Sequence, residues 1–438
     1  MMKGIAKMNI RKFLTALSAI CAPAILVAAV PEVNRVTMTQ ARDRTVTIAY
    51  NLSEPAVVTL DLVTNSPAGW VSIGVENVMK VSGDVWKLVS GGDHEITWHP
   101  DKDWTGNTVK LAAGGVKAVV TAWATDDTPD YMVVDISSGV ARKTVNFYPS
   151  EKHLPGGLLG NDAYRLTKIV MRRINAANVQ WTMGSNFEAG RNAASEAAHT
   201  VTLARNYYIG VFELTQGQFA EVTGIGDMSG VRTHADSPLR PLNSVSYNKM
   251  RCAPCTSAGA NTYVGGAWPN APYEGSFLDL LRKRTGVDFD LPTEAEWEFA
   301  CRSGTHEGLW NDGSMRTDAN LPGEWIKGRQ QSETSPQPCG SFAPSKWGLY
   351  DMHGNVYELC HDWHQNDITA LGGVANVSLA NPLNCFDGTA GSKRVRRGGA
   401  CHTASGACNA SIRNVNYDPA SADNKWGYRL VCPVGLAE

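Results

Sequence analysis

Apolar and polar residues alternate with a period of two in the first third of the chain. In two stretches the apolar side chains fall on one face of an extended backbone: Val46, Ile48, Tyr50 and Leu52, then Val58, Leu60 and Leu62. Further short candidate strands cover 70–73, 95–98, 116–123 and 132–136. Such alternation, broken by Gly, Asn, Asp and Pro, is typical of half-buried antiparallel strands. We therefore predict an immunoglobulin-like β-sandwich over residues 33–149, with Trp98, Trp104 and Trp123 in its core.

The pattern changes after a segment rich in Pro and Gly, 150–164, which predicts a linker. Three short helices then begin at cap residues with their partners three positions on, namely Thr215 with Gln218, Ser276 with Asp279, and Thr293 with Glu296. Each helix ends at a glycine: Gly224, Gly286 and Gly304. In the second helix we expect Phe277, Leu280 and Leu281 to point inward. Three short helices among many Gly and Asn residues predict an irregular α+β domain over 165–438.

The N-terminal thirty residues differ from the rest. Lys3, Lys7, Arg11 and Lys12 precede an apolar run, 13–30. This order predicts a secretory signal peptide over 1–30, with an uncleaved membrane anchor as the alternative. We expect an exported protein (periplasmic, cell-surface or extracellular) with no stable membrane span after cleavage.

The net charge of the 438-residue chain is only −2. Proteins that bind a nucleic-acid backbone need a concentration of positive charge. The sequence has no such concentration, and we therefore exclude a nucleic-acid partner and expect an unknown protein or small-molecule ligand.

Ten cysteines are present. Cys21 lies in the N-terminal segment, and the others all follow residue 250. Export permits disulfides, and an odd number of remaining cysteines leaves one thiol outside any pairing within the chain. Cys252 and Cys255 form a C-x-x-C pair with no second ligand pair nearby. A disulfide within it, or links to Cys339 or Cys385, is favoured over catalysis.

Seven segments resemble, in the same order, those of the formylglycine-generating enzyme or sulfatase-modifying factor family. They are VQWTMGSN (179–186), YYIGVFELTQGQFAEVTG (207–224), RPLNSVSY (240–247), LPTEAEWEFACRSG (291–304), GLYDMHGNVYELCHDW (348–363), RVRRGGA (394–400) and WGYRLV (426–431). The resemblance covers most of 165–438 and none of the first domain. It implies a C-type-lectin-like fold there, whereas function does not follow from fold alone.

The resemblance also implies an activity. The family's oxidases convert a sulfatase cysteine to formylglycine with oxygen and Cu(I), which two cysteines hold. Two thiolates are soft ligands that suit Cu(I). Cys401 and Cys408 lie in the corresponding region, but seven residues apart instead of five, and neither matches residue by residue. We interpret them as a structural disulfide or as buried thiols, with copper as the alternative.

Further family features map onto single positions. The resemblance implies a disulfide between Cys301 and Cys432. It also implies a calcium site, in which the side chain of Asn355, the carbonyl of Val356 and the carboxylate of Glu358 supply oxygen ligands. The alternative is a buried Glu358 satisfied by backbone amides. A second calcium site near 320 lacks a recognisable acidic partner.

The family cleft would lie between segments 396–408 and 414–429. Candidate lining residues are Arg413, Asn416, Asp418 and Trp426, and for each the alternative is a scaffold role. His353, His361 and His364 cluster near the turn at 354, where we favour structural roles.

Two functions follow from these observations. One is an exported non-oxidase module that binds a ligand or partner; the alternative is a divergent copper-dependent formylglycine-generating oxidoreductase.

Overall fold

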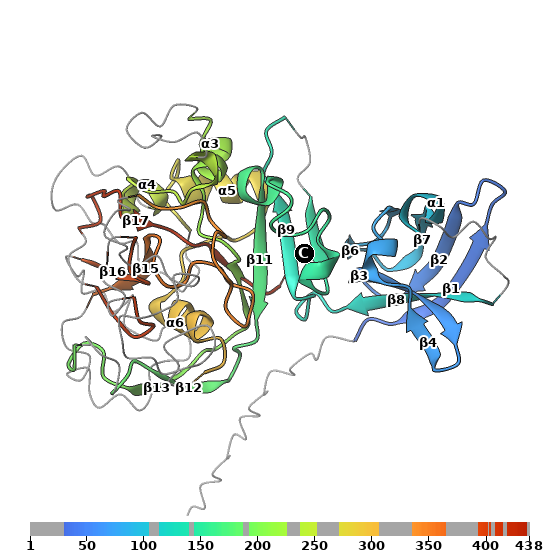
Figure 1. Cartoon of the computed structure of the whole chain (residues 1–438), viewed down its shortest axis with the longest axis horizontal. Helices are drawn as coiled ribbons and strands as arrows, with labels where there is room; N and C mark the ends of the chain where they lie inside the picture. Colours follow the sequence, from blue (N-terminus) through green and yellow to red (C-terminus); the bar gives the residue numbers. More distant parts are fainter. Residues whose placement is uncertain are drawn as a thin grey trace, which may run out of the picture. The chain divides into compact units, whose positions relative to one another are not determined.

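The computed structural model describes residues 30–104, 114–139, 144–186, 192–225, 237–251, 271–305, 335–364, 393–401, 403, 408–414 and 418–435. Strands predominate in these ranges, and the helices are short (Figure 1). The helices are α1 (Pro100–Asp103), α2 (Ala163–Leu166), α3 (Gln216–Thr223), α4 (Tyr247–Arg251), α5 (Phe277–Thr285) and α6 (Glu294–Arg302), with 3₁₀ turns η1 (Val75–Asn77), η2 (Glu151–His153) and η3 (Ser237–Leu239). Across those ranges, no helix has both the length and the apolar character that crossing a bilayer requires.

Two antiparallel sheets form within residues 33–123. The first has the order β1 (Val33–Gln40), β2 (Val46–Leu52), β7 (Gly92–Trp98) and β5 (Val81–Gly83). The second has the order β4 (Gly69–Ser72), β3 (Ala56–Ser66) and β6 (Lys87–Val89), and β8 (Val116–Trp123) also pairs with β3. The predicted apolar faces of β2 and β3 are buried in one shared core. Trp98 is fully buried there, and Trp104 packs against this core from its edge. The immunoglobulin-like topology stays a prediction.

A five-stranded antiparallel sheet follows, with the order β10, β9, β11, β14 and β18. Its strands are β9 (Tyr131–Asp135), β10 (Val145–Tyr148), β11 (Lys168–Ile174), β14 (Tyr207–Gly210) and β18 (Val431–Pro433). Because Met132 and Val134 share a core with Ile169 and Met171, the segment expected at 132–136 lies in the sheet of the second domain. Hydrogen-bonded pairing therefore crosses the boundary expected at residue 149.

The segment 150–164 differs from the expected linker. It contains η2 and the start of α2, and Leu154, Leu158 and Tyr164 are buried. Its glycines serve turns: Gly156 and Gly157 both have positive φ values, of 81° and 74°. Pro and Gly here shape a packed loop, which composition alone does not distinguish from a linker.

The three predicted helices are confirmed with their N-terminal caps, and Gly224 and Gly286 end the first two, whereas Ser303 and not Gly304 is the C-cap of the third. Thr215 and Thr293 each form a complete capping box, and Ser276 accepts a hydrogen bond from the backbone N–H of Asp279. One further detail was wrong, because Leu280 is 36% exposed, whereas Leu278 is fully buried. At 100° per residue, position 278 shares the inner face with 277 and 281, whereas 280 lies at its edge. Helices α3 and α5 lie side by side through stacked Phe219 and Phe277 rings (Figure 1).

A small mixed sheet contains several of the residues predicted to bind a metal or to line the cleft. In it β15 (Tyr357–Trp363) lies between β16 (Arg394–Arg397), which is antiparallel, and β17 (Trp426–Gly427), which is parallel. Helix α6 and the pair β12 (Gln180–Met183) and β13 (His199–Thr202) enclose a further core around Trp297. Taken together, the described residues form a mixed fold of mostly strands with few helices.

The five-stranded sheet predicts which N-terminal truncations the fold tolerates, because β9 and β10 belong to it. A chain that begins at residue 150 lacks β9 and β10, which leaves Ile169 and Met171 uncovered. We expect it to lose a cooperative thermal transition followed by circular dichroism, while a chain that begins at residue 124 retains one. Equal transitions in the two shortened chains would show that β9 and β10 are dispensable.

Candidate functional site

The turn before β15 is held in an unusual backbone conformation. Asp351 and Asn355 both have φ of 59°, and Gly354 has φ of 105°. Asp and Asn tolerate this left-handed region better than most residues do. The backbone N–H of Gly354 donates to the carbonyl of Gly398 at 2.7 Å, and that of Cys401 donates to the carbonyl of Asn355 at 2.9 Å. The turn is thereby tied to the glycine-rich loop that follows β16.

Glu358 lies on β15 and is buried. Its Oε1 accepts a hydrogen bond from Nη2 of Arg429, and its Oε2 accepts one from Nε1 of Trp297, both at 2.6 Å. The guanidinium of Arg429 also donates to three backbone carbonyls, those of Gly210, Val211 and Tyr350. Both oxygens of Glu358 are therefore engaged by buried donors of the protein.

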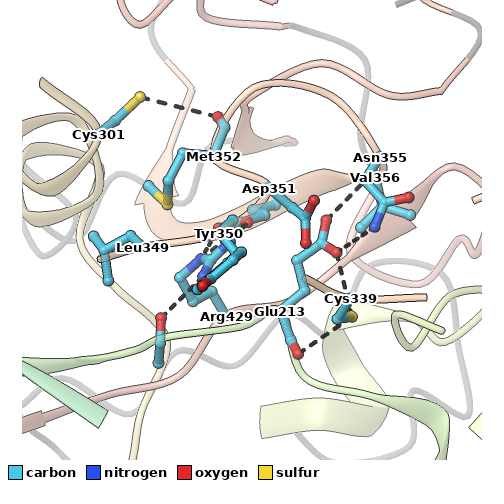
Figure 2. Close-up of polar contacts among 12 residues, drawn as sticks. Glu213, Cys301, Cys339, Leu349, Tyr350, Asp351, Met352, Asn355, Val356 and Arg429 are labelled. Carbon is cyan, nitrogen blue, oxygen red and sulfur yellow. Dashed lines mark hydrogen bonds and ion pairs between the residues drawn. The ribbon is translucent and has the colours of Figure 1, made fainter. Parts of the chain in front are cut away.

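Glu213 lies directly opposite the turn (Figure 2). Its Oε2 accepts from Nδ2 of Asn355 at 2.6 Å, and its Oε1 accepts from the backbone N–H of Val356 at 3.3 Å. The thiol of Cys339 lies 3.5 Å from Oε2. The amide oxygen of Asn355 is also in use, because it accepts from the backbone N–H of Gln337 at 2.8 Å. Asn355 thus joins Glu213 to the turn.

Asp351 adds a further carboxylate to this cluster, and Figure 2 shows it directed toward Glu213. Burial raises the pKa of Asp351 to about 6, and the charge of Glu358 contributes. Burial also raises the pKa of Glu213 well above its usual range, with the charges of Asp351 and Glu358 adding to the effect. Three buried carboxylates thus gather around the guanidinium of Arg429, which lowers both pKa values only in part.

Calcium at Asn355, Val356 and Glu358 stays a prediction, and the structure shows what the oxygens of this region contact. The side-chain oxygens of Asn355, Glu358 and Glu213 all accept hydrogen bonds from the protein, and Oδ2 of Asp351 accepts from the backbone N–H of Gly340 at 2.6 Å. No group of three or more His, Cys, Asp or Glu side chains in the described ranges has a metal-binding arrangement. The carboxylates of Glu213 and Asp351, whose oxygens are of the kind that hard cations take, lie near Asn355 and Val356 in this turn (Figure 2).

Cys401 and Cys408 are both buried, with 3% and 0% of their surface exposed. Burial raises the pKa of Cys408 to about 12, and the nearby Cys401 contributes. A Cβ at Gly399 would lie only 2.3 Å from Sγ of Cys408, so the glycine is needed for the packing. The carbonyl of Cys408 is 2.8 Å from Nδ1 of His353. Because copper and nucleophilic chemistry use accessible thiolates, this pair does not fit an exposed Cu(I) site.

The disulfide expected between Cys301 and Cys432 is not formed. Both residues are free buried thiols, as are Cys339 and Cys360. Sγ of Cys301 contacts Nε2 of His353 at 3.6 Å, whereas Cys432 lies in the core of the five-stranded sheet. Cys252, Cys255 and Cys385 lie outside the described residues.

Burial shifts the pKa values of His353, His361 and His364 in the same direction. Burial lowers the pKa of His353 and of His364 to about 4, and it lowers the pKa of His361 well below its usual range. These imidazoles are therefore neutral at physiological pH. They belong to no metal-binding cluster of the described residues.

The expected cleft residues are placed as follows. Arg413 is buried and its Nε donates to Oε1 of Glu294 at 2.6 Å. Asp418 is exposed and accepts from the backbone N–H two residues on, which shapes a turn. Trp426 is buried on β17, and Asn416 lies outside the described residues. Arg413 is therefore held in a buried ion pair and Asp418 in an exposed turn, whereas Trp426 borders a polar cluster.

That polar cluster, here called the Tyr357 cluster, comprises Tyr357, Arg396, Thr403, Asn414 and Trp426. The guanidinium of Arg396 lies 4.4 Å from the ring centroid of Tyr357 and 5.0 Å from that of Trp426. Its Nε and Nη2 donate to Oδ1 of Asn414 at 3.1 and 2.6 Å. The hydroxyl of Tyr357 accepts from Asn414 at 3.1 Å and from Thr403 at 3.2 Å. Arg396, Thr403 and Asn414 are partly exposed.

A cavity of about 140 Å³ lies elsewhere, against the five-stranded sheet. Phe147, Tyr208, Val287 and Cys432 are among its lining residues. It includes none of the residues expected to bind a metal or to line the cleft.

The family profile that matches this chain describes the FGE-sulfatase family, the sulfatase-modifying factor enzyme 1-like domain, over residues 168–434. The chain belongs to this family. The formylglycine-generating enzyme of Mus musculus is 25% identical over 327 residues, which are 68% of this chain and 82% of the relative. That of Thermomonospora curvata is 33% identical over 168 residues, 35% of this chain and 53% of the relative.

Solved structures that are similar to this chain include Treponema denticola variable protein 1 and PvdO from Pseudomonas aeruginosa. The first matches with a TM-score of 0.44 and 23% identity, covering 61% of this chain and 96% of that chain. The second matches with a TM-score of 0.45 and 21% identity, covering 60% and 94%.

Sequence reasoning missed several residues of this sulfatase-modifying factor domain. Asp351 stands four residues before Asn355 in the same motif. Its acidic side chain could have marked it as a candidate cation ligand. Glu213 carries no local signal, because its partners come from a distant turn. Tyr357 precedes the buried Glu358 on β15, and Arg396 precedes the buried Arg397 on β16. Because neighbouring residues of a strand point to opposite faces of the sheet, this alternation could have placed Tyr357 and Arg396 on the other face.

Arg413 provides a test of the scaffold assignment in this family member. We expect Arg413→Ala to lower the free energy of unfolding by about 3–5 kcal/mol, because it leaves a buried carboxylate of Glu294 without this partner. The control Asp418→Ala changes an exposed turn, and we expect an effect within about 0.5 kcal/mol. Urea unfolding measures both. Equal small effects would contradict a scaffold role for Arg413.

Proposed function

We propose that the chain is an exported member of the sulfatase-modifying factor family that binds a ligand or partner protein without oxidising cysteine. The burial of Cys401 and Cys408 supports the proposal most directly, since Cys408 has a pKa of about 12 and is a thiol at neutral pH. An oxidase of this family would need two accessible thiolates for Cu(I). Export is proposed from the basic residues and apolar run of the N-terminal segment.

The named relatives support more than one function for this fold. Besides the formylglycine-generating enzymes, the chain is 26% identical over 208 residues to the chaperone protein LppX of Paenibacillus barcinonensis, 42% of this chain and 71% of the relative. Serine/threonine-protein kinase pkn1 of Chlamydia caviae matches over 149 residues at 31% identity. We also propose that the sheets of residues 33–123 form an immunoglobulin-like spacer or partner-binding module.

The second candidate is a divergent copper-dependent oxidase. It is favoured by the match to the mouse formylglycine-generating enzyme, which extends over 68% of the chain. Under this hypothesis Cys401 and Cys408 would have to leave their buried positions to bind Cu(I).

A single assay distinguishes the two candidates. The mature protein is mixed with Cu(I), oxygen, a reductant and a peptide that carries Cys-x-Pro-x-Arg, and mass spectrometry follows the peptide cysteine. We expect no formylglycine, because buried thiols do not present copper to a substrate. Conversion that disappears in Cys401→Ser or Cys408→Ser would establish the oxidase and overturn the binding module.

We also propose that a calcium ion stabilises the turn at 351–358, held by the carboxylates of Glu213 and Asp351. Their position together at this turn (Figure 2) supports the site, because a divalent cation would balance the two charges once both carboxylates are ionised. The ion would have a structural role and would join the loop of Glu213 to the start of β15.

Calcium should therefore raise the melting temperature relative to EGTA. At a concentration a hundred times its Kd, the ion would add about 2.7 kcal/mol to the free energy of unfolding. We expect Glu213→Gln to abolish this increment and the exposed control Glu76→Gln to preserve it. An identical response in both variants, or none in the parent protein, would exclude calcium at this place.

A further inference from the structure

The cavity against the five-stranded sheet has a buried floor and an open mouth. Its floor is built by side chains from four strands, each at most 2% exposed: Met132, Phe147, Tyr208 and Cys432. They come from directly paired positions on β10 and β9 and on β14 and β18, and paired residues point to the same side of a sheet. At the end of helix α5 the lining residues Gly286 and Asp288 are exposed, which opens the cavity to solvent.

The floor offers an aromatic and sulfur-containing surface. The ring centroids of Phe147 and Tyr208 lie 6.5 Å apart, and the two rings are tilted by 54°. Met132 and Cys432 add the sulfur-containing side chains. A further ring entering this space would contact ring edges and polarisable sulfur, and both attract aromatic groups.

The hydroxyl groups of the wall are engaged by the protein itself. Those of Thr128 and Tyr208 lie 2.7 Å from each other, and that of Tyr208 also donates to the carbonyl of Pro129 at 2.5 Å. The hydroxyl of Thr285 donates to a carbonyl one turn back in α5 at 2.8 Å. Burial raises the pKa of the Cys432 thiol well above its usual range, so this side chain is uncharged at neutral pH. A polar guest would give up its hydrogen bonds to water on entering, which favours an apolar one.

The volume of the cavity suits a single ring. Protein interiors pack closely and contain few voids larger than a water molecule, and an unfilled cavity lowers stability. An apolar cavity of about 150 Å³ in another protein holds benzene. The cavity described here has about 140 Å³, and the half-buried Val145 and Val287 add apolar surface to its wall. A guest of one ring would therefore replace the contacts that the void leaves unmade.

We propose that this cavity binds a single apolar aromatic ring, packed on the Phe147 and Tyr208 rings and covered by Val287 at the mouth. The site goes beyond the proposed function, because its lining includes neither the cysteines at 401 and 408 nor the turn at 351–358. It does not depend on whether the chain oxidises cysteine. The side chain of Asp288 is 61% exposed, and its charge at the mouth disfavours an anionic guest.

The probe is toluene, with benzoate as its match in which a carboxylate replaces the methyl group. The full chain is labelled with ¹³C at its methionine methyl groups and titrated with each probe. Toluene should shift the methyl signal of Met132 saturably, through the ring current, and should leave that of Met38 on β1 unchanged. The signal of Met132 is identified by its loss in Met132→Leu. We expect benzoate to bind at least about tenfold more weakly, because its charge would be buried without a partner.

Two substitutions fill the cavity from opposite walls. Val287→Phe and Val145→Phe each place a ring in the space of the guest, and we expect each to weaken toluene binding by at least about tenfold. Val119→Phe makes the same change on β8, where the side chain is 43% exposed, and should bind toluene as the parent protein does. Thermal unfolding shows which variants are folded, and either filled variant suffices for the test. Unaltered toluene binding in a folded filled variant would overturn the site.

Two other results would also contradict the proposal. One is equal affinity for toluene and benzoate, and the other is a shift of Met38 as large as that of Met132. Both a free aromatic molecule and a phenylalanine side chain of a partner supply the ring, and N-acetylphenylalaninamide distinguishes these sources in the same titration. Binding of this amide more tightly than toluene assigns the site to a side chain, and weaker binding assigns it to a free molecule.

Discussion

The ion pair between Glu358 and Arg429 is the contact on which the centre of the domain depends. Arg429 precedes β18, Glu358 lies on β15, and the same guanidinium holds carbonyls of β14 and of the segment before the turn at 351. Two sheets are thus joined through one buried cation. Breaking a buried pair by removing one partner generally costs several kcal/mol, because the remaining charge stays in a medium of low polarisability.

That pair also explains why the neighbouring carboxylates have unusual pKa values. Arg429 is already engaged by Glu358, and what remains of its field lowers the pKa values of Glu213 and Asp351 only in part. Burial then favours the neutral forms of both acids. Either a bound proton or a bound cation can neutralise these two buried acids. Stabilisation by a proton depends on pH, whereas stabilisation by a cation is removed by a chelator.

Much of the fold could be predicted from the sequence where its causes are local. The capping boxes at Thr215 and Thr293 depend on residues three positions apart, and the alternation in β2 and β3 depends on neighbours. The sheet to which β9 belongs could not be predicted, because the alternation of apolar and polar residues in a strand does not identify the strand with which it pairs. The same limit applies to Glu213 and Arg396, whose roles arise from residues that are distant in the chain. The spacing of Cys401 and Cys408 differs from the oxidase pattern in the sequence itself, whereas the pairing expected for Cys301 was wrong.

The close contact between Gly399 and Cys408 bears on how such a loop can change by mutation. Any side chain at position 399 would meet the sulfur, and the glycine also has φ of 79°, which disfavours other residues. A larger residue at 408 would meet the same backbone. The loop and the sulfur therefore constrain each other, and a copper-binding arrangement with different spacing cannot be reached by one substitution. For mutation to convert this buried thiol into a copper ligand with the oxidase spacing, both the length and the packing of the loop would have to change.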